Sequence, residues 1–243
     1  MLKEAIQHYK QSHGYSQFSP RCVLFDMDGV LYNSMPNHAV AWHEAMKQFG
    51  IHFTADDSYA TEGARGVDTI RKYVLEQQGK EISSEEAQRM YDVKTEIFHH
   101  MPIAEIFPGV IDIMQKIKSA GMTIGVVTGS GQRPLIKRLL NDFDGFLTED
   151  HIVTAYDVER GKPNPDPYLM GLRKTGNNNP WQGIVVENAP LGVRAGSAAN
   201  CFTIGINSGP LPDSALADNG ANIVLQQMTE LCSIWDELLQ NID

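Results

Sequence analysis

The chain alternates short apolar segments with stretches of helical periodicity. The apolar segments are uncharged, rich in β-branched residues and short, as buried strands are. An alternation of this kind predicts an α/β fold, a Rossmann-like parallel sheet core with helices on both faces. Five strands are expected, at residues 23–25, 123–127, 184–186, 202–206 and 223–225.

Helices are predicted between these strands from apolar residues that recur every three or four positions. Residues 110–120 show this spacing between Pro108-Gly109 and Gly121, the latter placed as a C-terminal stop. Further helices are expected at 164–174, from about 132, at 191–199 and at 228–238.

Residues 35–102 have a different pattern, with no convincing strand and three helical stretches at 39–49, 69–78 and 84–100. We expect an all-helical cap domain, inserted after the first strand, that covers the carboxyl edge of the sheet. The core domain then consists of residues 19–34 and 103–243. Residues 1–18 are expected to be a helical or frayed appendage.

Composition agrees with an independently folding protein. The chain has 243 residues, 42% of them hydrophobic, which is enough for a substantial core. Because no apolar run approaches the roughly 20 residues of a membrane span and the first residues do not resemble a signal peptide, we expect a cytoplasmic protein with no membrane partner. Three widely spaced cysteines indicate neither disulfides nor a thiolate metal site.

The formal net charge of −10 argues against nucleic acid as a partner, because nucleic-acid binding requires a clustered basic face. An anionic substrate is repelled at long range, but salt screens this repulsion beyond about 8 Å. A small phosphorylated partner therefore remains possible if the site itself holds a cation. The oligomeric state is open, with a monomer favoured.

Polar signatures follow three of the predicted strands: Asp26-Met27-Asp28, Thr128-Gly129-Ser130 and Glu187-Asn188. In open α/β sheets, ligands bind outside the carboxyl ends of the strands, so these signatures should converge on one site. Each of them also meets a requirement of phosphoryl transfer, in which catalysis consists mainly of positioning and charge neutralisation.

Asp26 and Asp28 have the residue type and spacing for two different roles. A carboxylate at Asp26 can attack phosphorus and form an acyl phosphate. Because the chain leaves the strand at Gly29, Asp28 can reach another side of the substrate, where it would protonate the leaving oxygen and later activate water. The alternative is a surface turn, since Asp and Gly are common turn residues.

Thr128, Gly129 and Ser130 offer a hydroxyl and backbone N–H groups just before a helix, which together could cradle a phosphate. The alternative is a helix start without a ligand. Lys162, between Gly161 and Pro163, could serve as counter-ion to both a carboxylate and a phosphate, or be a solvated loop lysine. The surrounding residues do not match the GxxxxGK[ST] pattern of a nucleotide P-loop.

Glu187 and Asn188, beside Asp26, would make an oxygen-only site suited to Mg²⁺. The alternative is a capping pair for the next helix. The serines and the eight histidines match no catalytic triad or HExxH motif.

Together these motifs resemble the haloacid dehalogenase (HAD) superfamily, in the β-phosphoglucomutase-like branch with a helical cap. The resemblance covers the chain from about Arg21 onward. It implies that Asp26 is the nucleophile and Asp28 the general acid/base, and that Thr128 and Lys162 bind phosphate. It also implies that Mg²⁺ binds Asp26, the Asp28 carbonyl and the acidic motif at Glu187-Asn188.

Two residues depart from that branch. Asn188 stands where the family usually has Asp, and in the cap loop Arg65 lies two residues after Gly63, where related mutases place an arginine three residues after the glycine. We therefore consider that Glu62, from the cap loop, restores the missing charge at the metal; its alternative is a solvent-facing acid.

The combination of motifs resembles bacterial HAD inorganic pyrophosphatases most closely. Pyrophosphate, or another small phosphate, is therefore the favoured substrate. Two alternatives remain: a β-phosphoglucomutase with His38, Arg65 and Lys94 as cap contacts, and a non-catalytic HAD-fold binding module.

Overall fold

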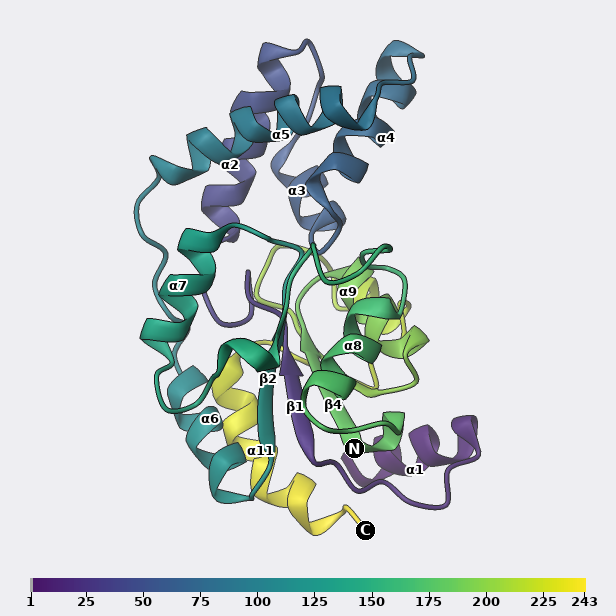
Figure 1. The fold of residues 1–243 in the computed structure, drawn as a ribbon. Coiled ribbons are helices and arrows are strands. Elements are labelled where there is room, and N and C mark those ends of the chain that lie inside the picture. Colours follow the sequence, from purple (N-terminus) through teal and green to yellow (C-terminus); the bar gives the residue numbers. More distant parts are fainter. Residues whose placement is uncertain (1) are drawn as a thin grey trace.

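The core of the protein is a six-stranded parallel sheet with strand order β3-β2-β1-β4-β5-β6 (Figure 1). The structure is a computed structural model, and it describes residues 2–243. The sheet contains one strand that the pattern did not predict, β3, because its two residues are too few to show alternation. The strands are β1 (Cys22–Phe25), β2 (Thr123–Val127), β3 (Ile152–Val153), β4 (Gly183–Glu187), β5 (Phe202–Ile206) and β6 (Ile223–Leu225).

Helices cover both faces of the sheet, as the sequence predicted (Figure 1). On one face α6 (Val110–Ser119) packs against α11 (Met228–Gln240), and on the other α8 (Asp166–Lys174) packs against α9 (Pro190–Ala198). The remaining core helices are α7 (Arg133–Asp142) and α10 (Ser214–Ala217), with 3₁₀ turns η1 (Glu149–His151) and η2 (Pro180–Gln182).

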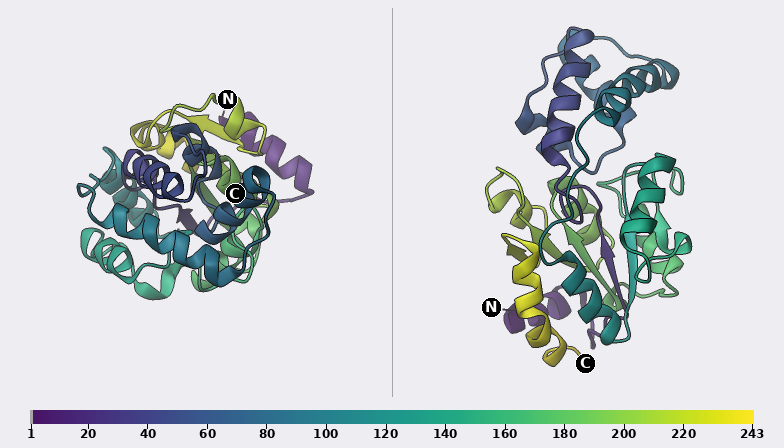
Figure 2. Two further views of the ribbon diagram at one scale, coloured as in Figure 1. Left: turned by 90° about the horizontal axis from the view of Figure 1, so that it is seen from above. Right: turned by 90° about the vertical axis from the view of Figure 1, so that its left-hand side faces the viewer.

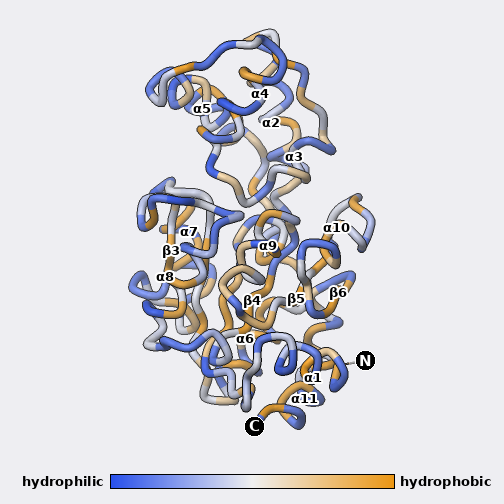
Figure 3. Tube along the Cα trace, turned by 90° about the vertical axis from the view of Figure 1, so that its right-hand side faces the viewer, coloured by the Kyte–Doolittle hydropathy of each residue, from blue (hydrophilic) through white to orange (hydrophobic). Residues whose placement is uncertain are grey.

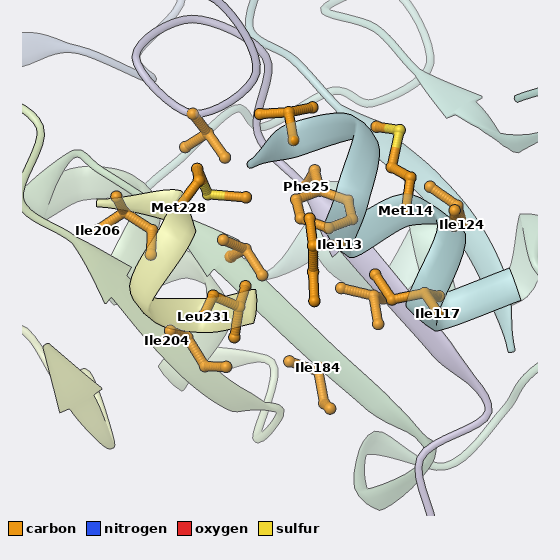
Figure 4. Packing of buried hydrophobic residues seen from close by; sticks show 14 of the residues in the cluster. Phe25, Ile113, Met114, Ile117, Ile124, Ile184, Ile204, Ile206, Met228 and Leu231 are labelled. Atoms are coloured by element: carbon orange, nitrogen blue, oxygen red, sulfur yellow. The ribbon is translucent and has the colours of Figure 1, made fainter. Parts of the chain in front are cut away.

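The largest hydrophobic cluster lies under α6 and α11 (Figure 4). The apolar residues of α6, spaced for one helix face, bury Ile113, Met114 and Ile117 against strand residues such as Phe25 and Ile184. Burying side chains of this size contributes about 1.5–3 kcal/mol each. Figure 3 shows hydrophobic residues concentrated in the strands of the core, whereas the outer helices mix both kinds.

The register of β1 brings the polar signatures together. Phe25 pairs with Val126 of β2 on one side and with Val186 of β4 on the other. The residues that follow these three positions therefore leave the sheet at the same edge.

Residues 35–102 form four helices and no strand, all within the described part of the chain, and lie above that edge (Figure 2). They are α2 (Met35–Gln48), α3 (Ala55–Thr61), α4 (Gly66–Gln78) and α5 (Ser84–His99). Helix α3 was not predicted, because seven residues hardly show a helical period. A capping box formed by Thr54 and Asp57 fixes its start.

The N-terminal segment corrects one prediction. Residues 1–18 were expected to be a helical or frayed appendage; the helix is present as α1 (Leu2–His13), but it packs on the core domain. Its residues Leu2, Ile6 and Tyr9 are buried in the main cluster, and the Tyr9 hydroxyl donates to the Asn200 carbonyl at 2.8 Å. The spacing of these three residues is helical, so the signal was present but lies among many polar residues.

Within residues 2–243, no helix is long and apolar enough to cross a lipid bilayer.

Candidate active site

Asp26 and Lys162 meet at the carboxyl edge of the sheet, where both are almost completely buried. The Lys162 Nζ lies 2.6 Å from Asp26 Oδ1. It also donates to the carbonyl of Val127, the last residue of β2, at 3.0 Å. This ion pair compensates the charge of the Asp26 carboxylate, because burying an unpaired charge would cost free energy.

Glu187 is the second acid bound to Lys162. Its Oε1 lies 2.6 Å from the Lys162 Nζ and accepts a hydrogen bond from the Tyr168 hydroxyl at 2.8 Å. Its Oε2 accepts from the backbone N–H groups of Asn188 and Ala189, at 3.0 and 3.2 Å. Both oxygens of Glu187 are therefore engaged, and Glu187 holds Lys162 in place; its role as a metal ligand stays a prediction.

Asp28 points into a separate cluster that joins the core to the cap. The Ser34 hydroxyl donates to its Oδ1 at 2.6 Å, and His38 Nε2 lies 3.2 Å from the same oxygen. Lys94, from α5, donates to His38 Nδ1 at 2.7 Å. An ammonium can only donate, so Nδ1 accepts and the proton of neutral His38 sits on Nε2, facing Asp28.

Lys94 is enclosed by aromatic rings, although it carries the cation of this cluster. Its Nζ lies 4.8 Å from the ring centre of Phe98, 5.3 Å from that of Trp42 and 5.8 Å from that of Tyr91. Burial lowers the pKa of Lys94 to about 8, against the opposing charges of Glu62 and Asp28. Burial and the Lys94 charge also lower the pKa of His38.

The two aspartates have different acidities. Burial raises the pKa of Asp26 to about 7, although the Lys162 charge opposes the shift. Burial acts in the same direction on Asp28, but His38, Ser34 and Lys94 outweigh it and lower the pKa of Asp28. Two carboxyl groups with separated acidities are the usual sign of separate roles.

Glu62 is the cap residue that faces these acids. It lines a polar cavity of about 40 Å³ together with Asp28, His38, Lys94 and residues of the core loop after β2. Burial, followed by the charges of Asp28 and Asp26, raises the pKa of Glu62 to about 8. Glu62 therefore faces the cavity, unlike the solvent-facing acid of the alternative interpretation, and the Lys94 charge only partly offsets the rise in its pKa.

Arg65 lies outside this cavity. Its guanidinium donates to Asp68 and, at 2.7 Å, to the Glu159 carbonyl of the core, and it lines a neighbouring cleft of about 340 Å³ that Lys162 also lines. Of the three cap contacts expected for a mutase, His38 and Lys94 reach the cavity and Arg65 does not.

The loop after β2 lies against the cap. Gly129 and Ser130 line the cavity, and the Thr128 hydroxyl accepts from the Ser130 N–H at 3.0 Å. A β-carbon at Gly129 would lie 3.1 Å from the Gly63 carbonyl oxygen of the cap loop. The predicted phosphate cradle is thus at the right edge of the sheet and directly beneath the cap.

Two buried oxygens in this corner have no hydrogen-bond partner, Asp26 Oδ2 and Asn188 Oδ1. Within residues 2–243, no three His, Cys, Asp or Glu side chains are grouped to hold a metal. The candidate donors here include the Asn188 amide oxygen and the Asp28 backbone carbonyl, which are not among those four side-chain types. Two unpaired buried oxygens suit Mg²⁺, which prefers oxygen ligands and retains several waters.

Glycine is required where these donors meet. Gly29 has φ of +83°, and a β-carbon there would lie 2.0 Å from Asn188 Nδ2. Any larger residue would displace the Asn188 side chain.

Sequence reasoning missed three residues that support the site. Ser34 has the signature of a helix start before Met35-Pro36, but its hydroxyl binds Asp28 and does not cap α2. Tyr168 resembles an ordinary apolar-face residue of α8. Gln132 contacts His99 Nε2 at 2.8 Å and Thr95 at 3.3 Å in the cap, and nothing in its surroundings signalled this contact.

Comparison with known proteins gives a family match that spans most of the chain. Residues 23–206 match the model of the haloacid dehalogenase-like hydrolases. Hexitol phosphatase A of Escherichia coli is 30% identical over 87% of this chain and 94% of its own length. Beta-phosphoglucomutase of Bacillus subtilis is 24% identical over 87% of this chain and 91% of its own length.

A solved structure extends the similarity to the whole fold. A Bacteroides vulgatus protein, provisionally assigned as a beta-phosphoglucomutase, superimposes with a TM-score of 0.95 at 45% identity, covering 100% of this chain and 98% of that one. The parallel sheet and the helical cap are therefore shared with beta-phosphoglucomutase-like proteins.

Proposed function

Since this chain belongs to the haloacid dehalogenase-like hydrolase family, we propose that it is a Mg²⁺-dependent phosphohydrolase with Asp26 as nucleophile and inorganic pyrophosphate as favoured substrate. The observation that carries the choice of substrate is the small cavity beneath the cap, which contains Glu62 but not Arg65.

The reaction divides between the two aspartates. An Asp26 oxygen attacks phosphorus and forms a P–O bond, while the bond from phosphorus to the leaving group breaks. The leaving oxygen takes a proton from Asp28. Asp28 then accepts a proton from water, whose oxygen attacks phosphorus and releases the Asp26 carboxylate and inorganic phosphate.

The surrounding residues position these groups. Lys162 holds Asp26 Oδ1 and balances charge on the phosphoryl group. Ser34 and the Nε2–H of His38 hold Asp28 at the edge of the cavity. The metal would be held by Asp26, Asn188 and the Asp28 carbonyl, with Glu62 close by in the closed cap, and its charge would offset that of the phosphate oxygens.

Cavity size supports a small substrate. The cavity measures about 40 Å³, well below the roughly 300–1,000 Å³ of pockets that enclose a drug-sized ligand. A sugar ring would require the cap to open, whereas a second phosphate group is a smaller addition. A mutase must also grip a second phosphate with its cap, and the Arg65 guanidinium is already bonded to Asp68 and to the Glu159 carbonyl.

A substrate panel tests the proposal. We expect pyrophosphate to be hydrolysed faster than β-glucose 1-phosphate, hexitol phosphates or glycerol phosphates, with phosphate release as the readout. Faster release from a polyol phosphate would instead point to an activity like that of the hexitol phosphatase relative.

Two alternative functions have distinct signatures in the same panel. Conversion of β-glucose 1-phosphate to glucose 6-phosphate would indicate the mutase, which is favoured by His38 and Lys94 at the cavity and by the beta-phosphoglucomutase relatives. No turnover of any substrate would indicate the non-catalytic binding module, for which Asn188 in place of an acid is the supporting feature.

A further inference from the structure

Tyr168 connects the two charged partners in the centre of the site. It lies on α8, which begins four residues after Lys162, and is completely buried. Its hydroxyl donates to Glu187 Oε1 at 2.8 Å, and the Lys162 Nζ lies 5.2 Å from the centre of its ring. One side chain therefore contacts the anion through its hydroxyl and the cation through its ring face.

The bonds around Lys162 are fully used. An ammonium has three N–H donors, and those of Lys162 go to Asp26, Glu187 and the Val127 carbonyl. To contact an incoming phosphoryl group, Lys162 must share or release one of these bonds. The Val127 carbonyl is part of the backbone, so the competition is between the two carboxylates.

We propose that Tyr168 is a positioning residue for phosphoryl transfer, whose hydroxyl shares Glu187 Oε1 with Lys162 and so keeps the Lys162 charge available to Asp26 and the phosphoryl group. The inference rests on the proposed reaction at Asp26.

The donors around Glu187 determine how tightly it holds Lys162. Oε2 is held by two backbone N–H groups, so the carboxylate cannot rotate away, and Oε1 receives both Lys162 and Tyr168. A second donor to Oε1 takes up part of its negative charge and weakens its hold on the ammonium. Without the hydroxyl, Glu187 binds Lys162 more tightly at the expense of Asp26 and the substrate.

Tyr168→Phe is the direct test, because it removes the hydroxyl and keeps the ring. Tyr9→Phe is its matched control: Tyr9 is also completely buried and also donates one hydrogen bond at 2.8 Å, but at α1. We expect kcat of Tyr168→Phe to fall about fivefold to tenfold, the scale of one lost hydrogen bond of ordinary net strength. Its affinity for inorganic phosphate, measured by calorimetry with Mg²⁺, should fall in parallel.

For Tyr9→Phe we expect kcat and phosphate affinity within twofold of the wild type. A structural role alone would lower the melting temperature of both variants and leave kcat and phosphate affinity of the folded protein unchanged. The inference is overturned if Tyr168→Phe behaves like Tyr9→Phe in both measurements.

A double-mutant cycle with Glu187→Gln tests whether the hydroxyl acts through Glu187. A neutral amide has no charge to share, so Tyr168→Phe should change phosphate affinity less in the Glu187→Gln background than in the wild type. Equal effects in the two backgrounds would contradict the inference. Asp26→Asn separates a failure of the proposed reaction from a failure of the role of Tyr168. If Asp26→Asn retains turnover, the proposed reaction is refuted. If Asp26→Asn is inactive and Tyr168→Phe behaves like the wild type, only the role of Tyr168 is refuted.

Discussion

At the scale of single residues, two aspartates two positions apart acquire different chemistry from their neighbours. Asp26 shares Lys162 with Glu187, and burial keeps its pKa near 7. Asp28 receives the Ser34 hydroxyl and faces His38, and its pKa is lowered. The raised pKa of Asp26 means that further cationic charge favours its ionised, nucleophilic form, and the lowered pKa of Asp28 keeps this carboxylate ionised, as the step that takes a proton from water requires.

Glu62→Gln tests whether the cap carboxylate supports metal binding. Removing its charge should weaken the apparent affinity for Mg²⁺ about tenfold, the lower end of the loss seen when residues around a metal site are changed. Titration of Mg²⁺ by calorimetry measures this without turnover, and activity against Mg²⁺ concentration gives a second reading. Asp68→Asn is a nearby control in the first turn of α4, because Asp68 contacts Arg65 and does not line the cavity. Unchanged Mg²⁺ affinity in Glu62→Gln would refute this role.

Lys94 gives a prediction for stability against pH. Its pKa of about 8 in the folded protein lies below the usual lysine value of 10.5. Between these two pH values the unfolded chain binds more protons than the folded one, so the contribution of Lys94 to stability rises with pH. Charged Lys94 therefore destabilises the fold below pH 8. Lys94→Met removes this buried charge. The free energy of unfolding of Lys94→Met minus that of the wild type should therefore fall by about 2–3 kcal/mol from pH 7 to pH 10.

Urea unfolding in the presence of EDTA measures this difference at both pH values. Lys116→Met is a suitable control, because Lys116 is paired with Asp236 at the surface. A stability difference between Lys94→Met and the wild type that does not change with pH would contradict a lowered pKa.

At the scale of secondary-structure elements, α1 contributes to the packing of the core. Tyr9 contacts Phe18 and Phe202 edge-on, with ring centres 5.4 Å away in both cases. The chain terminus closes over the same region, because Asp243 accepts from Lys10 and from the Phe18 N–H, both at 2.6 Å. These contacts fix α1 against β5 and α11 at the end of the sheet opposite the cap (Figure 1).

Tyr9→Ala should lower the free energy of unfolding by about 3–5 kcal/mol, the range for replacing a buried aromatic residue with alanine. Tyr156→Ala is the control, since Tyr156 is 84% exposed and should change stability by less than about 0.5 kcal/mol. Chemical denaturation compares the two. Equal stability of Tyr9→Ala and the wild type would mean that α1 is an appendage after all.

The elements with a clear period were predictable from the sequence, and the short ones were not. β1, β2 and β4 showed uncharged β-branched runs, and α6 showed apolar residues on one face, so the strand ends carrying Asp26, Thr128 and Glu187 could be placed at one edge. β3 and α3 have two and seven residues, too few for a period to appear. They depend on neighbouring strands and on a capping box instead.

The individual contacts of the site were less predictable than its location. That Lys162 would meet Asp26 followed from the need to pair a buried charge. That Glu187 would be saturated by Lys162, Tyr168 and two backbone groups depends on the path of α8 and on the start of α9, which a one-dimensional pattern does not contain.

At the scale of the whole molecule, the cap rests on the core through a small number of contacts around the cavity. Arg65 binds the Glu159 carbonyl on one side, and Gln132 binds Thr95 and His99 on another. The side view in Figure 2 shows the cap joined to the core by two connecting segments only. This arrangement lets the cap enclose a substrate while Glu62 and Lys94 remain next to Asp28.

The central claim is that Asp26 carries the phosphoryl group during turnover. The most direct measurement is peptide mass spectrometry of enzyme quenched in acid within the first turnover, with Asp28→Asn included because it slows the attack of water. We predict one phosphoryl group on the peptide containing Asp26, in a larger fraction of the Asp28→Asn variant than of the wild type. Release of phosphate in the first turnover with Asp26 unmodified in both proteins would contradict the account.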